Sequence, residues 1–315
     1  MIGHATNNGT SDSLILSELW SSQLKEILED ELMGQKYVHW LTEFPHGDQF
    51  TIPTIGDALV DDYVEGTAIK YRALQTGEFN FTISEYLSSG HAITDKMKQD
   101  SFYYNQLLAK FVPSQARAIQ VRLETDIFAL ANQQTLSNLN TINDADHRFV
   151  ANGSNETIAL ADFARANYAL TKANVPSSNR VAIVDPSVGF AVETLSNLVQ
   201  VSNNPRWEGI VESGMVSDMK FIKNVYGFDV YESNSLAVAN ETIDGKTTTA
   251  GKANLFFSAT SDILPFMGAW RQMPTVEGHR EPAYKEDRYD TTARYGLALY
   301  RPENLVVVLT DTDQV

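Results

Sequence analysis

The stretch FVPSQARAIQVRLETDIFALANQQ, from Phe111 to Gln134, decides the fold of this chain. Apolar side chains recur in it at the spacing of one helical face: Ile119, Leu123, Ile127, and Leu130 or Ala131. Pro113 suits a first turn and Ser114 is a suitable N-cap, so we predict that the helix begins there. At 1.5 Å per residue it is a rod of about 30 Å. Its wetter sides are expected to carry Arg117, Gln120, Arg122, Glu124 and Asp126.

The composition is that of a globular protein with one or two domains. Of 315 residues, 43% are hydrophobic and 20% are charged, and the formal net charge is -16. Only 24 basic residues are spread along the chain. Strong nucleic-acid binding needs clustered Lys and Arg, so this charge balance argues against it.

The chain contains no cysteine, which excludes disulfides, thiolate metal sites and a cysteine nucleophile. Its first 13 residues are polar and lack the basic and apolar regions of a secretory leader. No run of about 18 apolar residues occurs, so no membrane span is expected. We expect a soluble protein that is made and kept in the cytoplasm.

The N-terminal region reads as a polar arm followed by an amphipathic acidic helix at 14–33. Trp20 and Leu24 lie on its apolar face, and glutamates load the other face. Such a helix can pack on its own domain or reach a neighbouring subunit.

Between residues 39 and 86 the period changes to two, which indicates strands. The alternating apolar residues are Phe50, Ile52, Ile69, Tyr71, Phe79, Phe81 and Ile83. The acidic, turn-rich segment 56–66 is expected to form the irregular tip of a long hairpin. A two-stranded hairpin is marginal alone in water. We therefore expect an adjacent subunit to cover the face made by Phe79, Phe81 and Ile83.

The second half of the chain has α/β character. Thr157 is expected to cap a helix, and 181–184 is a buried strand that leads through Asp185, as N-cap, and Pro186 into another helix. This turn is not glycine-rich and carries an acidic cap, which argues against a nucleotide site. Further strands are expected around Gly227, at 253–257, at 288–300 and at 305–309.

No catalytic, nucleotide-binding or zinc-protease motif is present. Asp144, Asp146 and His147 could be read as metal ligands, but Asn/Asp/Gly clusters of this kind are more often loops. We predict no catalytic residue, no cofactor and no metal, and a structural or interaction protein instead of an enzyme.

The order of parts resembles the major capsid proteins of tailed bacteriophages, whose fold is shared by encapsulin shells. The most specific stretches are FNFTISEYLSSGHAITDKMKQD, VPSSNRVAIVDPSVGFAVETL, KNVYGFDVYESNSL and RYGLALYRPENLVVVLT. The resemblance implies an α+β fold with an N-terminal arm at 1–38 and an extended loop, a β hairpin, at 39–91. It implies a peripheral domain with the spine helix at 92–155 and 262–298, and an axial domain at 156–261 and 299–315.

The implied function is a major capsid protein that forms hexamers and pentamers of an icosahedral phage head around double-stranded DNA, which it binds weakly. The implied partners are a separate scaffolding protein, because only about 13 residues precede the predicted arm helix, a portal and a decoration protein. The virion would be assembled in the host cytoplasm. An encapsulin-like nanocompartment is the alternative, and a soluble enzyme or carbohydrate-binding module is a third class.

The residues expected to take part in assembly are Trp20, Leu24, Lys70, Phe79, Phe81 and Ile83. Some members of the family crosslink a loop lysine to an asparagine of a neighbour. Lys70 is the only lysine between Lys36 and Lys96, but nothing in the sequence marks it as reactive, and we predict no crosslink.

Overall fold

The computed structural model of the chain describes residues 32–42, 49–55, 60–69, 71, 76–100, 104–132, 140–194 and 221–311. They belong to one compact unit, Glu31–Val315. Of the predicted acidic helix at 14–33, only the last two residues are described, and they are not helical. Trp20, Leu24 and Lys70 lie outside the described residues.

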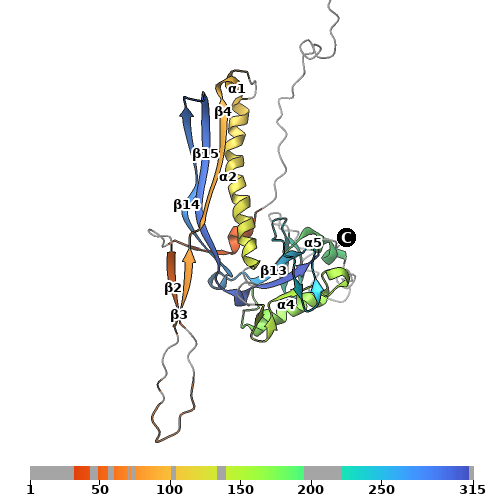
Figure 1. Cartoon of the computed structure of the whole chain (residues 1–315). Coiled ribbons are helices and arrows are strands. Elements are labelled where there is room, and N and C mark those ends of the chain that lie inside the picture. The colour runs from red at the N-terminus through yellow and green to blue at the C-terminus, as the bar shows by residue number, and fades with distance from the viewer. Residues whose placement is uncertain are drawn as a thin grey trace, which may run out of the picture. The chain divides into compact units, whose positions relative to one another are not determined.

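A long helix lies along a sheet of long strands (Figure 1). The helix is α2, Tyr104–Ala129, and a 3-10 turn, Leu130–Asn132, continues it. The sheet has the order β1 (Val38–Leu41), β14 (Phe266–Glu281), β15 (Glu286–Leu299) and β4 (Glu85–Thr94). Only β1 and β14 run parallel. The predicted apolar stripe of the helix is confirmed, because its members are all buried: Ile119, Leu123, Ile127, Leu130 and Ala131.

The predicted start of this helix is wrong, because α2 begins at Tyr104 and runs through Pro113. A proline inside a helix removes one backbone donor and crowds the carbonyl four residues earlier. The same residue is favourable in a first turn, so the local sequence does not distinguish the two positions. Packing of α2 on β4, β14 and β15 offsets the lost hydrogen bond.

Two polar side chains that were expected on the solvent-facing sides of α2 form hydrogen bonds to neighbouring elements instead. Glu124 is fully buried and accepts the backbone N–H of Gly34 at 3.0 Å, in the 3-10 turn Gly34–Tyr37. Asp126 accepts the hydroxyl of Tyr295 on β15 at 2.7 Å. Burial, and after it this hydrogen bond, raises the pKa of Tyr295. The helix therefore has polar contacts on the faces that also carry its apolar packing.

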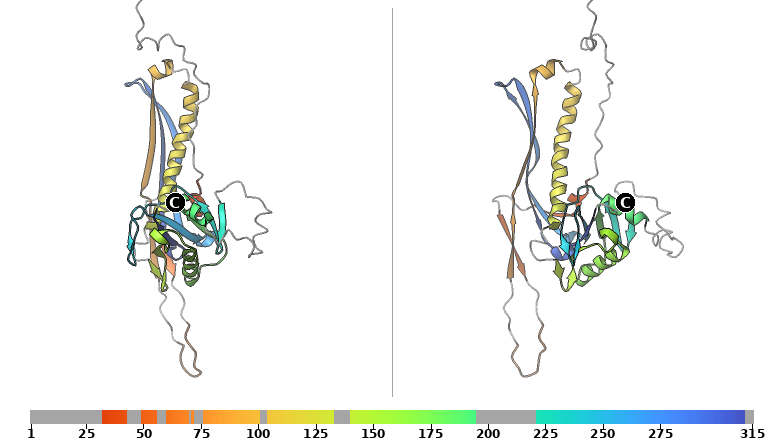
Figure 2. Two further views of the ribbon diagram at one scale, coloured as in Figure 1. Left: turned by 90° about the vertical axis from the view of Figure 1, so that its right-hand side faces the viewer. Right: turned by 45° about the vertical axis from the view of Figure 1, so that its right-hand side comes forward.

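The second sheet has six strands, in the order β7 (Arg148–Val150), β16 (Val306–Thr310), β13 (Lys252–Ser258), β8 (Arg180–Val184), β10 (Phe228–Glu232) and β9 (Phe221–Val225). Leu255 and Phe257 on one face of β13 pack with the end of α2. Phe256 on the other face packs with residues of α4 (Leu160–Lys172) and α5 (Pro186–Thr194). Figure 2 shows these two helices beside the sheet. The strands predicted at 181–184, 253–257, 305–309 and around Gly227 are confirmed.

Short elements complete the described part of the chain: α1 (Asp95–Asp100), the hairpin β2 (Gln49–Ile55) and β3 (Thr76–Thr82), the pairs β5 (Thr141–Ile142) with β6 (Ala145–Asp146) and β11 (Thr242–Ile243) with β12 (Lys246–Thr247), and the 3-10 turns Ser154–Glu156, Ser261–Ile263 and Pro302–Asn304. Among the described helices, none has the length and apolar character needed to cross a membrane.

The capping of the first α/β unit differs from the prediction at one helix and agrees at the other. The helix expected to start after Thr157 starts at Leu160, where the Asp162 carboxylate accepts the backbone N–H of Ala159 at 2.9 Å. Asp162 sits three residues inside the cap, so it can reach back to an N–H group that Thr157 does not serve. At α5 the predicted cap is confirmed, since Asp185 accepts the N–H of Ser187 at 3.1 Å.

A buried arginine joins the end of the long helix to the six-stranded sheet. Arg148, on β7, donates to Glu241 at 2.7 and 2.9 Å, to the carbonyl of Ala131 at 3.0 Å and to the Asn132 side chain at 3.1 Å. Residues 148–150 pair with β16, so they lie in the six-stranded sheet. The implied boundary at residue 155 would place them with the long strands instead.

Candidate functional site: the hairpin and the pocket at its base

The predicted hairpin is present as β2 and β3, with Phe50 opposite Phe81 and Ile52 opposite Phe79. The strand pattern expected at Ile69 and Tyr71 is wrong, because residues 60–69 contain no strand. Alternation over two or three residues is a weak strand signal, and nothing pairs with this stretch in the described part of the chain.

The expected covering of the hairpin face by an adjacent subunit is wrong for two of its three residues. Phe81 is 0% exposed and Ile83 is 6% exposed within this chain, where they pack with Met267 and Ala269 of β14. Gly296 on β15 allows this close approach, because a Cβ at that position would lie 2.5 Å from the carbonyl oxygen of Thr82. Phe81 and Ile83 therefore belong to the core of the subunit, and they anchor the base of the hairpin.

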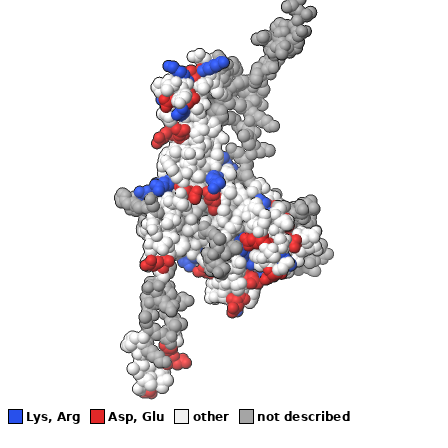
Figure 3. Space-filling model, in the orientation of Figure 1, with Lys and Arg blue, Asp and Glu red and all other residues white. Residues whose placement is uncertain are grey.

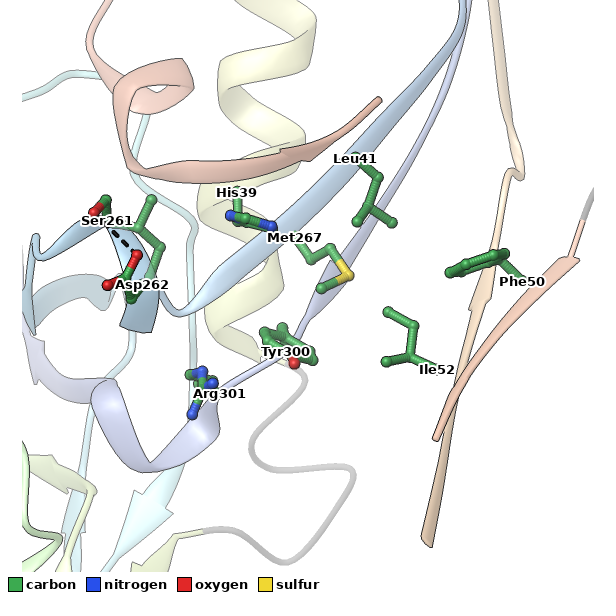
Figure 4. Close-up of a pocket in the computed structure, with 10 residues that line it drawn as sticks. His39, Leu41, Phe50, Ile52, Ser261, Asp262, Met267, Tyr300 and Arg301 are labelled. Atoms are coloured by element: carbon green, nitrogen blue, oxygen red, sulfur yellow. Dashed lines mark hydrogen bonds between the residues drawn. The ribbon is translucent and has the colours of Figure 1, made fainter. Parts of the chain in front are cut away.

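Phe79 is only partly buried and stands edge-on to Tyr300, with ring centroids 5.3 Å apart. Beside this pair lies a pocket of about 300 Å³ at the base of the hairpin, which we call the base pocket (Figure 4). It is lined by His39, Leu41, Phe50, Ile52, Ser261, Asp262, Leu264, Met267, Tyr300 and Arg301. No sequence signal pointed to it, since four separate segments of the chain meet there.

The base pocket has an apolar side and a polar side. Leu41, Phe50 and Ile52 lie on one side in Figure 4, and Asp262 and Arg301 lie on the other. The Nε atom of Arg301 is shielded from solvent and has no hydrogen-bond partner among the described residues. A buried guanidinium N–H without an acceptor is costly, so a rotation of this side chain toward an oxygen acceptor placed in the base pocket would be favourable.

The described part of the hairpin tip, residues 60–69 and 71, is exposed throughout. Val60 is 95% exposed and Tyr71 is 93% exposed, and Tyr63, Val64 and Ile69 are also largely exposed. Asp61, Asp62 and Glu65 lie among them. An apolar surface of this kind at the end of an extended element is typical of a protein contact site.

A charged network lies at the other end of the long strands, where α1 meets the turn between β14 and β15. Figure 3 shows basic and acidic side chains side by side at that end. Arg280 donates to Asp95 at 2.5 and 2.6 Å and to Asp287 at 2.9 Å, and Lys98 also pairs with Asp287. The hydrogen bond from Arg280 lowers the pKa of Asp95, and those from Lys98 and Arg280 lower the pKa of Asp287. The network fastens α1 to the tip of the sheet.

The residues considered as metal ligands are engaged separately. Asp146 pairs with Arg165 at 2.6 Å, and His147 is buried with its Nδ1 atom 3.0 Å from the carbonyl of Ala145. Burial lowers the pKa of His147. Within the residues that the structure describes, no group of three or more His, Asp or Glu side chains is placed to hold a metal ion.

Comparisons with known proteins agree with the architecture. A family model described as phage capsid protein matches residues 77–308. No curated protein matches the chain. A solved structure from Mycobacterium phage Che8 has 20% sequence identity and a TM-score of 0.67, with 96% of this chain and 98% of that chain covered.

Two further solved structures are similar. The capsid of cyanophage P-SCSP1u has 15% identity and a TM-score of 0.67, with 96% of this chain and 94% of that chain covered. The capsid of Ralstonia phage GP4 has 11% identity and a TM-score of 0.65, with 94% and 95% covered. At these identities the likeness shows a shared fold, and it covers nearly the full length of each pair.

Proposed function

Because this chain belongs to the family of phage capsid proteins, we propose that it assembles as hexamers and pentamers that close into an icosahedral head around double-stranded DNA. The protein is a major capsid protein with the tailed-phage capsid fold, and its place is the virion capsid. Capsid proteins are a structural class and not enzymes. The family match favours the phage head over the encapsulin-like nanocompartment.

The observation that carries the mode of assembly is the exposed hairpin tip. Its large apolar side chains gain nothing within their own subunit, since Val60, Tyr63 and Tyr71 are exposed there. Burying such side chains against another copy contributes about 1.5–3 kcal/mol for each large apolar group. Trp20 and Leu24 on the predicted N-terminal helix, and Lys70 beside the tip, are proposed as further contacts between copies.

Replacing residues 57–74 with a short Gly-Ser linker tests the proposal and leaves β2, β3, Phe81 and Ile83 in place. We expect the variant to melt cooperatively at the temperature of the unaltered chain and to form no closed shells. Calorimetry measures the first property and negative-stain electron microscopy the second. Normal shells from this variant would refute the role of the tip.

Phe81→Ala provides the contrast, because it removes a side chain from the core of the subunit. Truncating a buried phenylalanine costs about 3–5 kcal/mol. This variant should therefore melt at a lower temperature, whereas the linker variant should not. The pair of variants separates a defect in folding from a defect in assembly.

The proposed partners are a separate scaffolding protein, a portal and a decoration protein, with assembly in the host cytoplasm. The chain is proposed to divide into the arm, extended loop, peripheral domain and axial domain that the resemblance implies, except that residues 148–150 belong with the axial domain because they pair with β16. Electron microscopy of the chain expressed with and without its neighbouring genes tests the need for partners. Closed shells of uniform size from the chain alone would remove the scaffolding protein from the proposal.

A further inference from the structure

We propose that the hairpin tip of one copy, residues 60–69 and 71, binds in the base pocket of the next copy. This inference rests on the proposed assembly and specifies the contact that would join neighbouring copies. The partner is a second copy of this chain, and the two surfaces are different parts of the same molecule.

The lining of the base pocket favours a ligand that has one apolar group and two polar groups. Leu41, Ile52 and Met267 offer an apolar lining. On the polar side, the Nε–H of Arg301 has no acceptor within the described residues. Asp262 supplies a carboxylate there, and it is exposed. His39 and Tyr300 are the other titratable groups that line the pocket.

The hairpin tip carries this combination within a few residues. Tyr63 and Val64 supply exposed apolar surface between the carboxylates of Asp62 and Glu65. A carboxylate of the tip can accept from Arg301, and the hydroxyl of Tyr63 can donate to Asp262. Tyrosine suits such a half-apolar, half-polar site because its ring is buried while its hydroxyl is hydrogen-bonded.

The tip cannot bind in the base pocket of its own subunit while β2 and β3 remain paired. Strand β2 continues for three residues beyond Ile52, as far as Ile55, which corresponds to about 10 Å at 3.3 Å per residue and leads the chain away from the pocket. Val60, Tyr63 and Tyr71 are exposed within their own subunit. A second copy can supply the pocket. A head-to-tail contact between two different surfaces closes into a ring when the rotation that relates neighbouring copies is a whole fraction of a full turn. Rings of five and six copies are what the proposed shell needs.

The absence of cysteine from the chain makes a direct crosslinking test clean. The test variant combines Ala68→Cys, on the exposed tip, with Ser261→Cys, which lines the pocket. Purified shells are treated with a short bismaleimide crosslinker and run on a denaturing gel. We expect a ladder of covalent species that extends to pentamers and hexamers.

The matched control pairs Ala68→Cys with Ser154→Cys, an exposed serine that is not among the residues lining the pocket. Each single-cysteine variant is a second control. We expect no ladder from any of them. A ladder from the Ser154→Cys pair equal to that from the Ser261→Cys pair would overturn the assignment of the pocket.

Intact shells of the Ser261→Cys pair that give no ladder would overturn this inference and leave the proposed function standing. An unaltered chain that forms no shell under any condition with its neighbouring genes would overturn the proposed function itself. The two failures are therefore distinguished by electron microscopy of the same samples.

Arg301→Met supplies an independent measurement. Removing a donor to a charged acceptor weakens the contact, and we expect the subunit concentration at which shells appear to rise about tenfold. Light scattering measures this concentration, and calorimetry checks that the melting temperature of the subunit is kept. An unchanged threshold in a normally folded variant would contradict the role of Arg301.

Discussion

At the scale of single residues, Arg148 is the side chain on which the joint between α2 and the six-stranded sheet depends. Its side chain is 0% exposed and its partner Glu241 is 24% exposed. We predict that Arg148→Met lowers the free energy of unfolding by about 3–5 kcal/mol, because it removes the buried guanidinium that donates to Glu241 and to the carbonyl of Ala131. Chemical denaturation of the unassembled subunit measures this loss.

The matched control for Arg148 is Arg122→Met on α2. Arg122 is 59% exposed and pairs with Asp126 one helical turn away at 3.0 Å. Exposed pairs of this type contribute about 0–1 kcal/mol, so the control should unfold close to the unaltered chain. Equal losses from both variants would show that Arg148 has no special role.

Gly296 is the second residue at which the structure predicts a clear effect of a substitution. In Gly296→Ala, the new Cβ would meet the backbone of Thr82 and Ile83 at 2.5 and 2.9 Å. Strand β3 would have to move, at a cost of about 1–3 kcal/mol. We expect limited proteolysis to cut the hairpin faster than in Gly278→Ala, where the nearest atoms belong to the Tyr289 side chain at 3.3 Å.

At the scale of elements, the passage of α2 through Pro113 separates two accounts of the helix. If Pro113 lies inside the helix, Pro113→Ala restores a backbone donor and should stabilise the subunit by up to about 3 kcal/mol. Ser114→Ala should then have little effect, although loss of a true N-cap costs about 1 kcal/mol. Melting temperatures of the two variants decide the matter, and a cost at Ser114 with no gain at Pro113 would restore a helix start at this point.

The attachment of α1 to the β14–β15 turn should depend on pH. The folded-state pKa values of Asp95 and Asp287 are lowered by their hydrogen bonds to Arg280 and Lys98. Their contribution is therefore present above the ordinary carboxyl pKa and is lost as the pH falls below about 4. Hydrogen exchange of the α1 amides, corrected for intrinsic rates, should show this loss of protection.

Asp95→Asn is the control for the pH experiment, because it removes the charge that Arg280 binds. In this variant we expect the α1 amides to exchange faster already at neutral pH. Protection that is equal at pH 3 and pH 7 in the unaltered chain would mean that the network does not hold α1 in place.

At the scale of the whole molecule, the net charge of -16 is expected to weaken the affinity of the protein for DNA. Like charges repel across a Debye length of about 8 Å at physiological salt, so the wall of the shell should confine DNA without binding it tightly. We predict no submicromolar binding of the subunit to duplex DNA at that salt. Fluorescence anisotropy with a labelled duplex measures it, and tight binding would contradict the prediction.

Local patterns predicted much of this architecture, and long-range contacts explain what they missed. Two patterns are visible in the sequence: the helical stripe of Ile119, Leu123 and Ile127, and the two-residue period of the hairpin. They are visible because buried positions recur at a fixed spacing within each of these elements. Glu124 was placed on the wrong face because its partner, the N–H of Gly34, lies 90 residues away. The base pocket was missed for the same reason, since no single segment contains its chemistry.

The position of β16 determines when the six-stranded sheet can be completed during synthesis of the chain. This strand lies between β7 and β13, and it follows every other strand of the six-stranded sheet in the chain. Until residues 306–310 have left the ribosome, β13 keeps an open edge and Arg148 sits on a strand with no neighbour in the sheet. We therefore expect a chain that stops before β16 to leave the edge of β13 unpaired and its six-stranded sheet incomplete.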